Sequence, residues 1–350
     1  MLTLSAIQRL DSHVGFISGW TGSGLGLAET TDDGATWRRI DIPASHLTAL
    51  RFIDANTGWA GGFVAGGINV PCSQSDVSGA SVCYGVVLRT EDGGRSWQKA
   101  MSVPFVQAAG GVEPIAQLQA VDGQRAWVLI RGQSSEVRRT IDGGRTWTVV
   151  LRGDITAIRF ASADRGWIAI AEPNGSALVD ATSDGGNTWT DVFRTVGGAP
   201  FALDAATVKT AWLLTRDGGY CSSSTCDVYG LFRTDDGGAH WSSLGNPKAR
   251  TGACAVGQLD GPLFVTASSG WFALNLGAGG VAAPGGLMHT IDGGRTWGCA
   301  SQPGNTYLLS AADPMHVWVT SDDRSTEVTT LYSSDDGGVT WRSLDLRSVS

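Results

Sequence analysis

Seven aspartates recur at one position of a short motif, and they are the residues whose type and spacing could most readily do chemistry. The motif reads roughly Ser/Thr-x-Asp-x-Gly-x-Ser/Thr-Trp, and carboxylates in such a series could act as acids, bases or calcium ligands. Each aspartate, however, lies beside glycine between two β-prone runs, which is typical of a hairpin turn because glycine tolerates positive φ. In such a turn the carboxylate accepts backbone N–H bonds and the Trp covers the turn. We therefore expect structural roles, and no metal site, for Asp32, Asp92, Asp142, Asp184, Asp236, Asp292, Asp336, Trp37, Trp97, Trp147, Trp189, Trp241, Trp297 and Trp341.

The six cysteines are the second candidate group. Cys72 and Cys83 bracket one polar loop, Cys221 and Cys226 bracket a shorter one, and Cys254 and Cys299 remain as a third pair. An even count in loops rich in Ser and Gly favours disulfides and an oxidising compartment, with free thiols as the alternative. Neither loop has Cys-x-x-Cys spacing or a nearby His, which argues against a metal site. The first residues lack a basic leader followed by an apolar core, so we expect that a leader or anchor was trimmed from the natural protein.

Other arrangements of reactive residues do not point to an enzyme. The five histidines are scattered, and there is no Gly-x-Ser-x-Gly elbow or phosphate-cradling glycine loop, so we expect no cofactor. A net charge of −8 argues against nucleic acid as a partner, and no run of about 20 apolar residues predicts a transmembrane segment. A glycosidase needs two carboxylates about 5–10 Å apart, but spacing pairs no two of the candidates. These candidates are Asp76, Asp154, Glu172, Asp217, Asp227, Asp260 and Glu327.

The motif is part of a longer repeat that predicts the fold. Upstream of each copy lies an apolar strand, a short turn, and a small residue followed by an aromatic, as in residues 47–59 and 155–167. A third strand, the Asp turn and a fourth strand follow. Seven repeats of four antiparallel strands, with the Asp turn between the third and fourth, predict an all-β, seven-bladed β-propeller. We expect a monomer with a single domain over residues 1–350, with blades at residues 3–42, 46–102, 115–151, 154–194, 200–245, 258–300 and 306–347.

The motif resembles the Asp-box (BNR) repeat of sialidases, sortilin-type receptors and related propellers. The whole chain also resembles the seven-bladed photosystem II assembly/stability factor propellers, which run apolar strand, aspartate, Gly-Trp and then Thr-x-Asp-Gly-Gly-x-Thr-Trp around one ring. This resemblance implies a single ring, an extracytoplasmic setting (secreted, periplasmic or surface-anchored) and non-catalytic protein binding. The cysteine-bearing insertions depart from that group. Photosynthetic function does not follow from the blade motif, because the motif is scaffold only.

A carbohydrate-active enzyme or glycan-binding module is the alternative. The sialidase resemblance implies an arginine trio, a Tyr–Glu nucleophile pair and a Phe-Arg-Ile-Pro type motif near the N-terminus. That motif is missing here, and only five tyrosines and six glutamates are present. Asp-box xyloglucanases use two seven-bladed propellers around one cleft, whereas this chain has the length of one.

Insertions gather at one end of the predicted blades. The turn between the first two strands and the Asp turn are constant in length, whereas the loops between second and third strands are long in blades 2, 5 and 6. Loops on a rigid scaffold commonly carry binding, and short loops around blade 4 leave a gap between two raised walls. We expect Arg152 and Arg194 to point into this gap, joined by Arg131 and Arg250 from the walls. Because a guanidinium is a planar fork of donors, an acidic segment of another protein is the expected guest; solvated surface arginines are the alternative.

Overall fold

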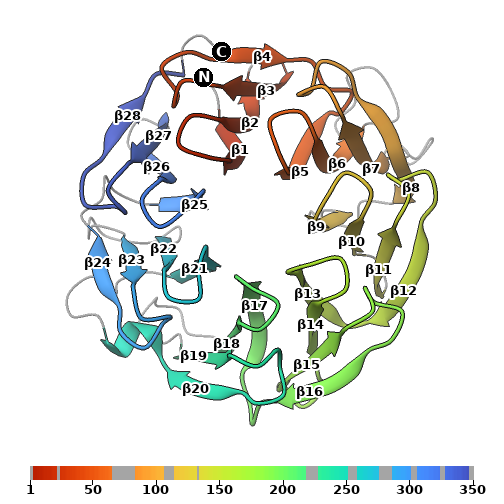
Figure 1. The fold of residues 1–350 in the computed structure, drawn as a ribbon, viewed down its shortest axis with the longest axis vertical. Helices are drawn as coiled ribbons and strands as arrows, with labels where there is room; N and C mark the ends of the chain where they lie inside the picture. The colour runs from red at the N-terminus through yellow and green to blue at the C-terminus, as the bar shows by residue number, and fades with distance from the viewer. Residues whose placement is uncertain are drawn as a thin grey trace, which may run out of the picture. The chain divides into compact units, whose positions relative to one another are not determined.

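The structure is a computed structural model that describes residues 3–21, 24–64, 83–105, 114–131, 134–217, 228–250, 258–275, 286–300, 306–323 and 328–346. The chain forms two compact units, whose strands are labelled in Figure 1. Unit 1 comprises Met1–Leu10, Val14–Gly153 and Arg347–Ser350, and unit 2 comprises Asp11–His13 and Asp154–Leu346. Each unit is described by itself.

Unit 1 contains three four-stranded antiparallel sheets, each made of consecutive strands. Blade 1 consists of β1 (Thr3–Arg9), β2 (Gly15–Thr21), β3 (Gly24–Thr30) and β4 (Arg38–Ile40). Blade 2 consists of β5 (His46–Phe52), β6 (Gly58–Val64), β7 (Cys83–Thr90) and β8 (Gln98–Phe105). Blade 3 consists of β9 (Ile115–Ala120), β10 (Ala126–Ile130), β11 (Ser135–Thr140) and β12 (Thr148–Gly153).

Unit 2 contains four sheets of the same kind. Blade 4 consists of β13 (Ile155–Phe160), β14 (Gly166–Ala171), β15 (Ala177–Thr182) and β16 (Thr190–Arg194). Blade 5 consists of β17 (Ala199–Ala205), β18 (Ala211–Asp217), β19 (Val228–Thr234) and β20 (Ser242–Gly245). Blade 6 consists of β21 (Gln258–Phe264), β22 (Gly270–Asn275), β23 (Leu287–Thr290) and β24 (Gly298–Ala300). Blade 7 consists of β25 (Thr306–Ala311), β26 (Val317–Asp323), β27 (Val328–Ser334) and β28 (Arg342–Leu344).

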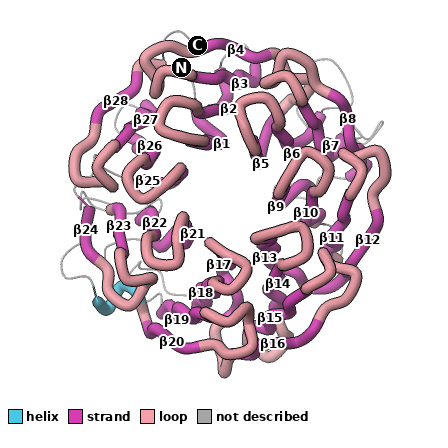
Figure 2. Tube along the Cα trace, viewed as in Figure 1, coloured by secondary structure: helices cyan, strands magenta, loops and turns pink. Residues whose placement is uncertain are grey.

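These sheets confirm the predicted all-β, seven-bladed propeller with four antiparallel strands per blade. Strands and turns make up nearly all of the described chain, beside one 3-10 turn at Pro247–Arg250 (Figure 2). Among the described residues, no helix is long and apolar enough to cross a membrane. The single domain over residues 1–350 stays a prediction.

The second strand of each blade supplies the core. In blades 2 to 7 this strand begins with Gly, Ala or Val followed by a Trp, and each of these Trp side chains is fully buried. The hydrophobic clusters lie between neighbouring sheets of each unit, as where Trp59 of blade 2 packs with Ile115 and Val128 of blade 3. Blade 1 has Phe16 in place of Trp. The buried tryptophans are Trp59, Trp127, Trp167, Trp212, Trp271 and Trp318.

The size of the residue before each buried Trp depends on the residue opposite it on the first strand. Gly166 lies opposite Phe160 on the neighbouring strand, and a Cβ added at Gly166 would lie 2.5 Å from the Phe160 ring. Gly58 has the same relation to Phe52, at 2.6 Å. Where the first strand ends in Ala instead of Phe, a larger residue takes the place of glycine. These pairs are Ala120 with Ala126, Ala205 with Ala211, and Ala311 with Val317.

Candidate functional site

The box aspartates hold turns together through bonds within their own motif. In blade 3, Thr140 Oγ1 donates to Asp142 Oδ1 at 2.8 Å and Thr146 Oγ1 donates to Asp142 Oδ2 at 2.6 Å. The Thr146 amide also donates to Asp142 Oδ1, at 2.9 Å, and the Gly144 amide donates to Thr140 Oγ1 at 2.9 Å. Gly143 and Gly144 both have positive φ, as the turn requires. These carboxylate oxygens are therefore filled by donors from the turn itself.

All seven boxes lower the pKa of their aspartate. The hydrogen bond from the Thr146 hydroxyl is the largest cause of the drop in the pKa of Asp142 to about 2. Blade 5 departs from the pattern in sequence, yet His240 Nδ1 lies 2.6 Å from Asp236 Oδ2 and takes the place of the usual hydroxyl. The box Trp side chains pack at the seven turns, as where Trp147 meets Trp59 edge to face at 6.3 Å. Among the described residues, no cluster of three or more His, Cys, Asp or Glu could hold a metal ion.

In unit 1, the expected groove arginines lie beside carboxylates. The Arg152 side chain is 64% exposed and its Nη2 lies 3.1 Å from Glu136 Oε2, across the β11–β12 hairpin. Glu136 also accepts from Arg138 Nε at 2.7 Å. Arg131 is exposed, and its backbone amide donates to the Pro114 carbonyl at 3.0 Å.

In unit 2, Arg194 is part of a second ion-pair group at the end of blade 4. Its Nε donates to Glu172 Oε2 at 2.9 Å, and its Nη2 lies 3.1 Å from Asp191 Oδ2. The Ser176 hydroxyl donates to Glu172 Oε2 at 2.5 Å and is the largest cause of the lowered pKa of Glu172. The side chain of Arg250 lies outside the described residues. The groove through Arg131, Arg152, Arg194 and Arg250 stays a prediction.

The cysteines lie mostly outside the described residues. Of Cys83 the backbone is described, and Cys299 is described and disulfide-bonded. Cys72, Cys221, Cys226 and Cys254 lie outside the described residues, so the three expected pairs stay predictions.

A set of arginines that the sequence reasoning missed joins neighbouring blades at the Asp-box end. We call the contact between two adjacent blades of one unit a seam. At the seam of blades 5 and 6, Arg233 stacks over the Trp212 ring at 5.1 Å and donates to the carbonyls of Gly293 and Ala267 at 3.0 and 2.8 Å. At the seam of blades 1 and 2, Arg38 donates to the Gly93 carbonyl at 2.9 Å.

The seam of blades 2 and 3 and the seam of blades 4 and 5 each have an arginine next to the Asp-box turn of the following blade. Arg89 lies over the Trp59 ring at 5.6 Å, and a Cβ at Gly143 of blade 3 would lie 3.2 Å from its Nη1. Arg165 lies over the Trp167 ring at 5.2 Å, and a Cβ at Gly237 of blade 5 would lie 2.8 Å from its Nη2. One signal in the sequence could have found part of this set, because Arg89 and Arg233 directly precede the first Thr of their boxes.

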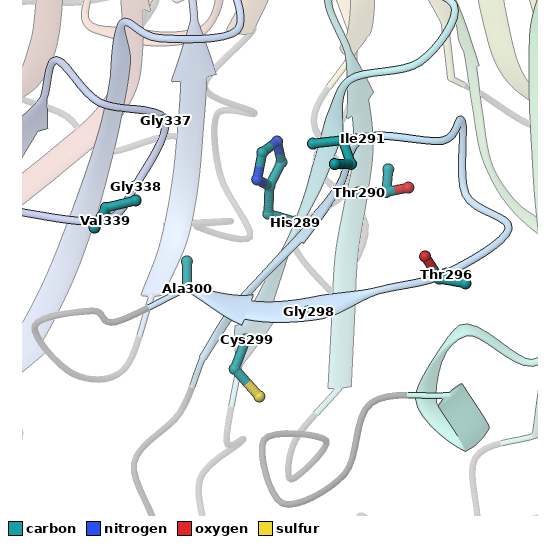
Figure 3. Close-up of a pocket in the computed structure, with 10 residues that line it drawn as sticks. All are labelled: His289, Thr290, Ile291, Thr296, Gly298, Cys299, Ala300, Gly337, Gly338 and Val339. Atoms are coloured by element: carbon teal, nitrogen blue, oxygen red, sulfur yellow. The ribbon is translucent and has the colours of Figure 1, made fainter.

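The seam of blades 6 and 7 contains a cavity of about 480 Å³ where the other seams carry an arginine (Figure 3). It is lined by the β23–β24 hairpin, including His289, Ile291 and Gly298, and by the loop from Gly337 to Val339. The His289 ring stands between these two segments (Figure 3) and stacks on Trp271 at 4.8 Å. Burial lowers the pKa of His289, so the ring is neutral at pH 7.

Comparisons with known proteins place this geometry among propellers. No protein-family profile matches the chain. It is 32% identical over 114 residues to the photosystem II assembly lipoprotein Ycf48 of Synechococcus sp. (strain CC9902), a match that spans 31% of this chain and 28% of that relative. The match therefore covers less than a third of the curated relative.

Solved structures match over more of the chain. A structure described as YCF48 bound to D1 peptide has a TM-score of 0.58 and 18% identity, over 91% of this chain and 90% of its own. The GH74 xyloglucanase of Xanthomonas campestris has a TM-score of 0.55 and 16% identity, over 97% of this chain but 60% of its own. Likeness at such identities shows the fold alone. The chain is thus a seven-bladed β-propeller that is similar to Ycf48, in sequence over 31% of its length and in fold over 91%.

Proposed function

We propose that this chain is a non-catalytic protein-binding propeller that works outside the cytoplasm and binds its partner at the loop end of the blades, opposite the Asp boxes. The observation that carries the proposal is the similarity to Ycf48, an assembly lipoprotein of which a structure is described as bound to D1 peptide. A disulfide-bonded Cys299 supports the extracytoplasmic setting, because disulfides persist in oxidising compartments.

The chemistry of Glu172 at the loop end of blade 4 favours binding over glycoside hydrolysis, although burial raises the pKa of another candidate, Asp260. A glycosidase acid needs a raised pKa, whereas the Ser176 hydroxyl and Arg194 hold the pKa of Glu172 below its ordinary value. Glu172 is instead the partner of an arginine that is about half exposed. A glycan-directed function therefore remains the weaker alternative.

The ion pairs also suggest how a protein partner would bind. Arg152 and Arg194 are each held by one or two carboxylates while much of the guanidinium faces solvent. A carboxylate of a partner can form an ion pair with such a guanidinium, and the loss of side-chain entropy is small because the arginine is already held in place. The proposed partner is therefore a protein segment that carries acidic residues.

The test is a pull-down from a periplasmic or membrane extract with wild type and the double variant Arg152→Gln/Arg194→Gln. Neutral glutamine is preferable to charge reversal, which would set a new carboxylate beside Glu136, Glu172 and Asp191. We expect the double variant to lose the partner and keep its melting temperature. The matched control is Arg145→Gln, an exposed arginine in the Asp-box turn of blade 3. Full binding by the double variant would show that neither arginine contributes to the binding.

A further inference from the structure

The seam of blades 6 and 7 lacks the side chain that fills its equivalents. Along the repeats, His289 occupies the position of Arg89 and Arg233, directly before the first Thr of the box. Gly298 occupies the position of Arg38, at the start of the fourth strand. Neither residue can reach across the seam as an arginine does. Among the described residues, therefore, no arginine reaches Gly337.

The acceptor side of the seam is nevertheless built as in the other blades. Gly337 has φ of +75°, the same as Gly293, whose carbonyl accepts from Arg233. The Gly337 amide donates to the Met315 carbonyl just as the Gly293 amide donates to that of Ser268. The Pro314 carbonyl lies 3.0 Å from a Cβ built at Gly337, in the place of the Ala267 carbonyl that also accepts from Arg233. Blade 7 thus presents the carbonyl groups that bind a guanidinium elsewhere.

The donor side offers a stacking surface in place of the missing side chain. In the seams of blades 2 and 3, 4 and 5, and 5 and 6 a guanidinium lies over a buried Trp, whereas here the neutral imidazole of His289 covers Trp271. A planar cation stacks on such a ring, and its alkyl stem packs on apolar neighbours. Ile291 and Val339, which are 75% and 67% exposed, line the cavity and supply those neighbours.

We propose that the cavity between blades 6 and 7 binds an arginine side chain of a partner protein, whose guanidinium takes the place that the chain's own arginines fill in the other seams. The site lies at the Asp-box end of unit 2 and is separate from the proposed loop-end surface. It goes beyond the proposed function, because it implies a second contact that selects a basic residue.

The charge at the site fits this guest. Arg38, Arg89 and Arg233 are paired with Glu29, Glu91 and Asp235, which lie in their own blades. Arg165 instead interacts with Asp236, the box aspartate of the next blade. Asp336 is the corresponding aspartate of blade 7, and its lowered pKa keeps it ionised at neutral pH. A bound guanidinium would therefore lie near the box aspartate of the next blade, Asp336, as Arg165 lies near Asp236.

The test is a titration of the full chain with acetyl-Gly-Arg-Gly-amide, followed through the His289 ring resonances in NMR spectra. We expect a saturable shift for the arginine peptide and binding that is about tenfold or more weaker for the matched lysine peptide, because an ammonium lacks the planar fork. No shift with the arginine peptide, or equal binding of the matched leucine peptide, would overturn the proposal.

Two variants fill the cavity with residues that the chain already uses in this place. His289→Arg copies blade 5, and Gly298→Arg copies blade 1, so each is expected to fold and to lose peptide binding by tenfold or more. For His289→Arg, whose reporter ring is gone, binding is measured by calorimetry. The matched control is Ser242→Arg, which adds the same charge at the seam already filled by Arg233 and should bind as wild type. Folded cavity-filling variants that bind like wild type would contradict the proposal, and if neither folds, the three peptides on wild type decide it.

Discussion

A box aspartate takes its hydrogen-bond donors from its own turn, as Asp142 does from Thr140 and Thr146. Asp142 accepts from one backbone amide and two hydroxyls, and none of these donors comes from another blade. The charged form is therefore the hydrogen-bonded form, which explains why its pKa falls from 3.8 to about 2. Such a carboxylate is committed to the turn and has little left to offer to a metal or a substrate.

This arrangement predicts a pH-dependent effect of Asp142→Asn. Because the folded pKa lies below the unfolded one, the stabilisation is present above about pH 4 and is lost as the pH falls through about 2. At pH 7 the variant should melt a few degrees below wild type. The difference should shrink as the pH falls from about 4 to about 2, where the wild-type carboxyl is about half protonated.

Melting temperatures measured from about pH 7 to about pH 2 check this prediction. The matched control is Asp154→Asn, an exposed carboxylate outside the boxes, which should melt like wild type throughout. A melting temperature that does not change in Asp142→Asn at pH 7, with partner binding lost, would mean that the box aspartate serves function and not structure.

At the scale of the strand pair, the blade core follows a size rule. The blades whose first strand ends in Phe have glycine opposite, and those that end in Ala have Ala or Val. The Phe ring fills the space that a Cβ on the opposite residue would need. A blade therefore accommodates Phe opposite Gly, or Ala opposite Ala or Val, but not two large side chains opposite each other.

The size rule predicts coupling between Phe160 and Gly166. Gly166→Ala should cost roughly 1–3 kcal/mol of unfolding free energy, because the new Cβ meets the ring 2.5 Å away. Phe160→Ala should cost about 3–5 kcal/mol through the cavity that it leaves. The double variant reproduces the Ala120–Ala126 pair of blade 3 and should be more stable than the sum of the two costs implies, by about 1 kcal/mol or more. Denaturant unfolding of the four proteins gives this coupling, and strict additivity would show that the two positions do not share the volume.

The same strands show what the sequence could and could not predict. Seven copies of the box and of a buried aromatic, six Trp and one Phe, predicted the strand order, because each mark has one place in the repeat. The ion pairs of Arg152 and Arg194 depend on which residues face each other across a hairpin, which spacing alone does not give. Arg38 and Arg233 donate to backbone carbonyls of the next blade, and no residue type in a sequence marks such an acceptor. At the cavity beside His289 the positions of Arg38 and Arg233 are taken by Gly298 and His289, and spacing alone does not show that these two positions face the same cavity.

At the scale of the whole molecule, disulfide bonds indicate the compartment in which the chain functions. A disulfide that closes a loop reduces the number of conformations that the loop can adopt. Cys299 is disulfide-bonded, and Cys72–Cys83, Cys221–Cys226 and Cys254–Cys299 are the pairs that we predict from the sequence. Three closed pairs would fit an oxidising compartment and a pre-ordered binding surface at the loop end.

We therefore expect the unfolded, unreduced protein to show no reactive thiol on titration, and the same sample to show six after reduction, one for each cysteine. Mass spectrometry of proteolytic fragments before and after reduction should recover the three pairs. Reduction should also weaken partner binding, because the reduced loops adopt more conformations and lose more conformational entropy when the partner binds. Replacing Cys72 and Cys83 together by serine separates this effect from the other pairs and should leave the melting of the blades nearly unchanged. Six reactive thiols in the unreduced sample would remove the argument for an extracytoplasmic setting and leave a scaffold suited to a reducing compartment.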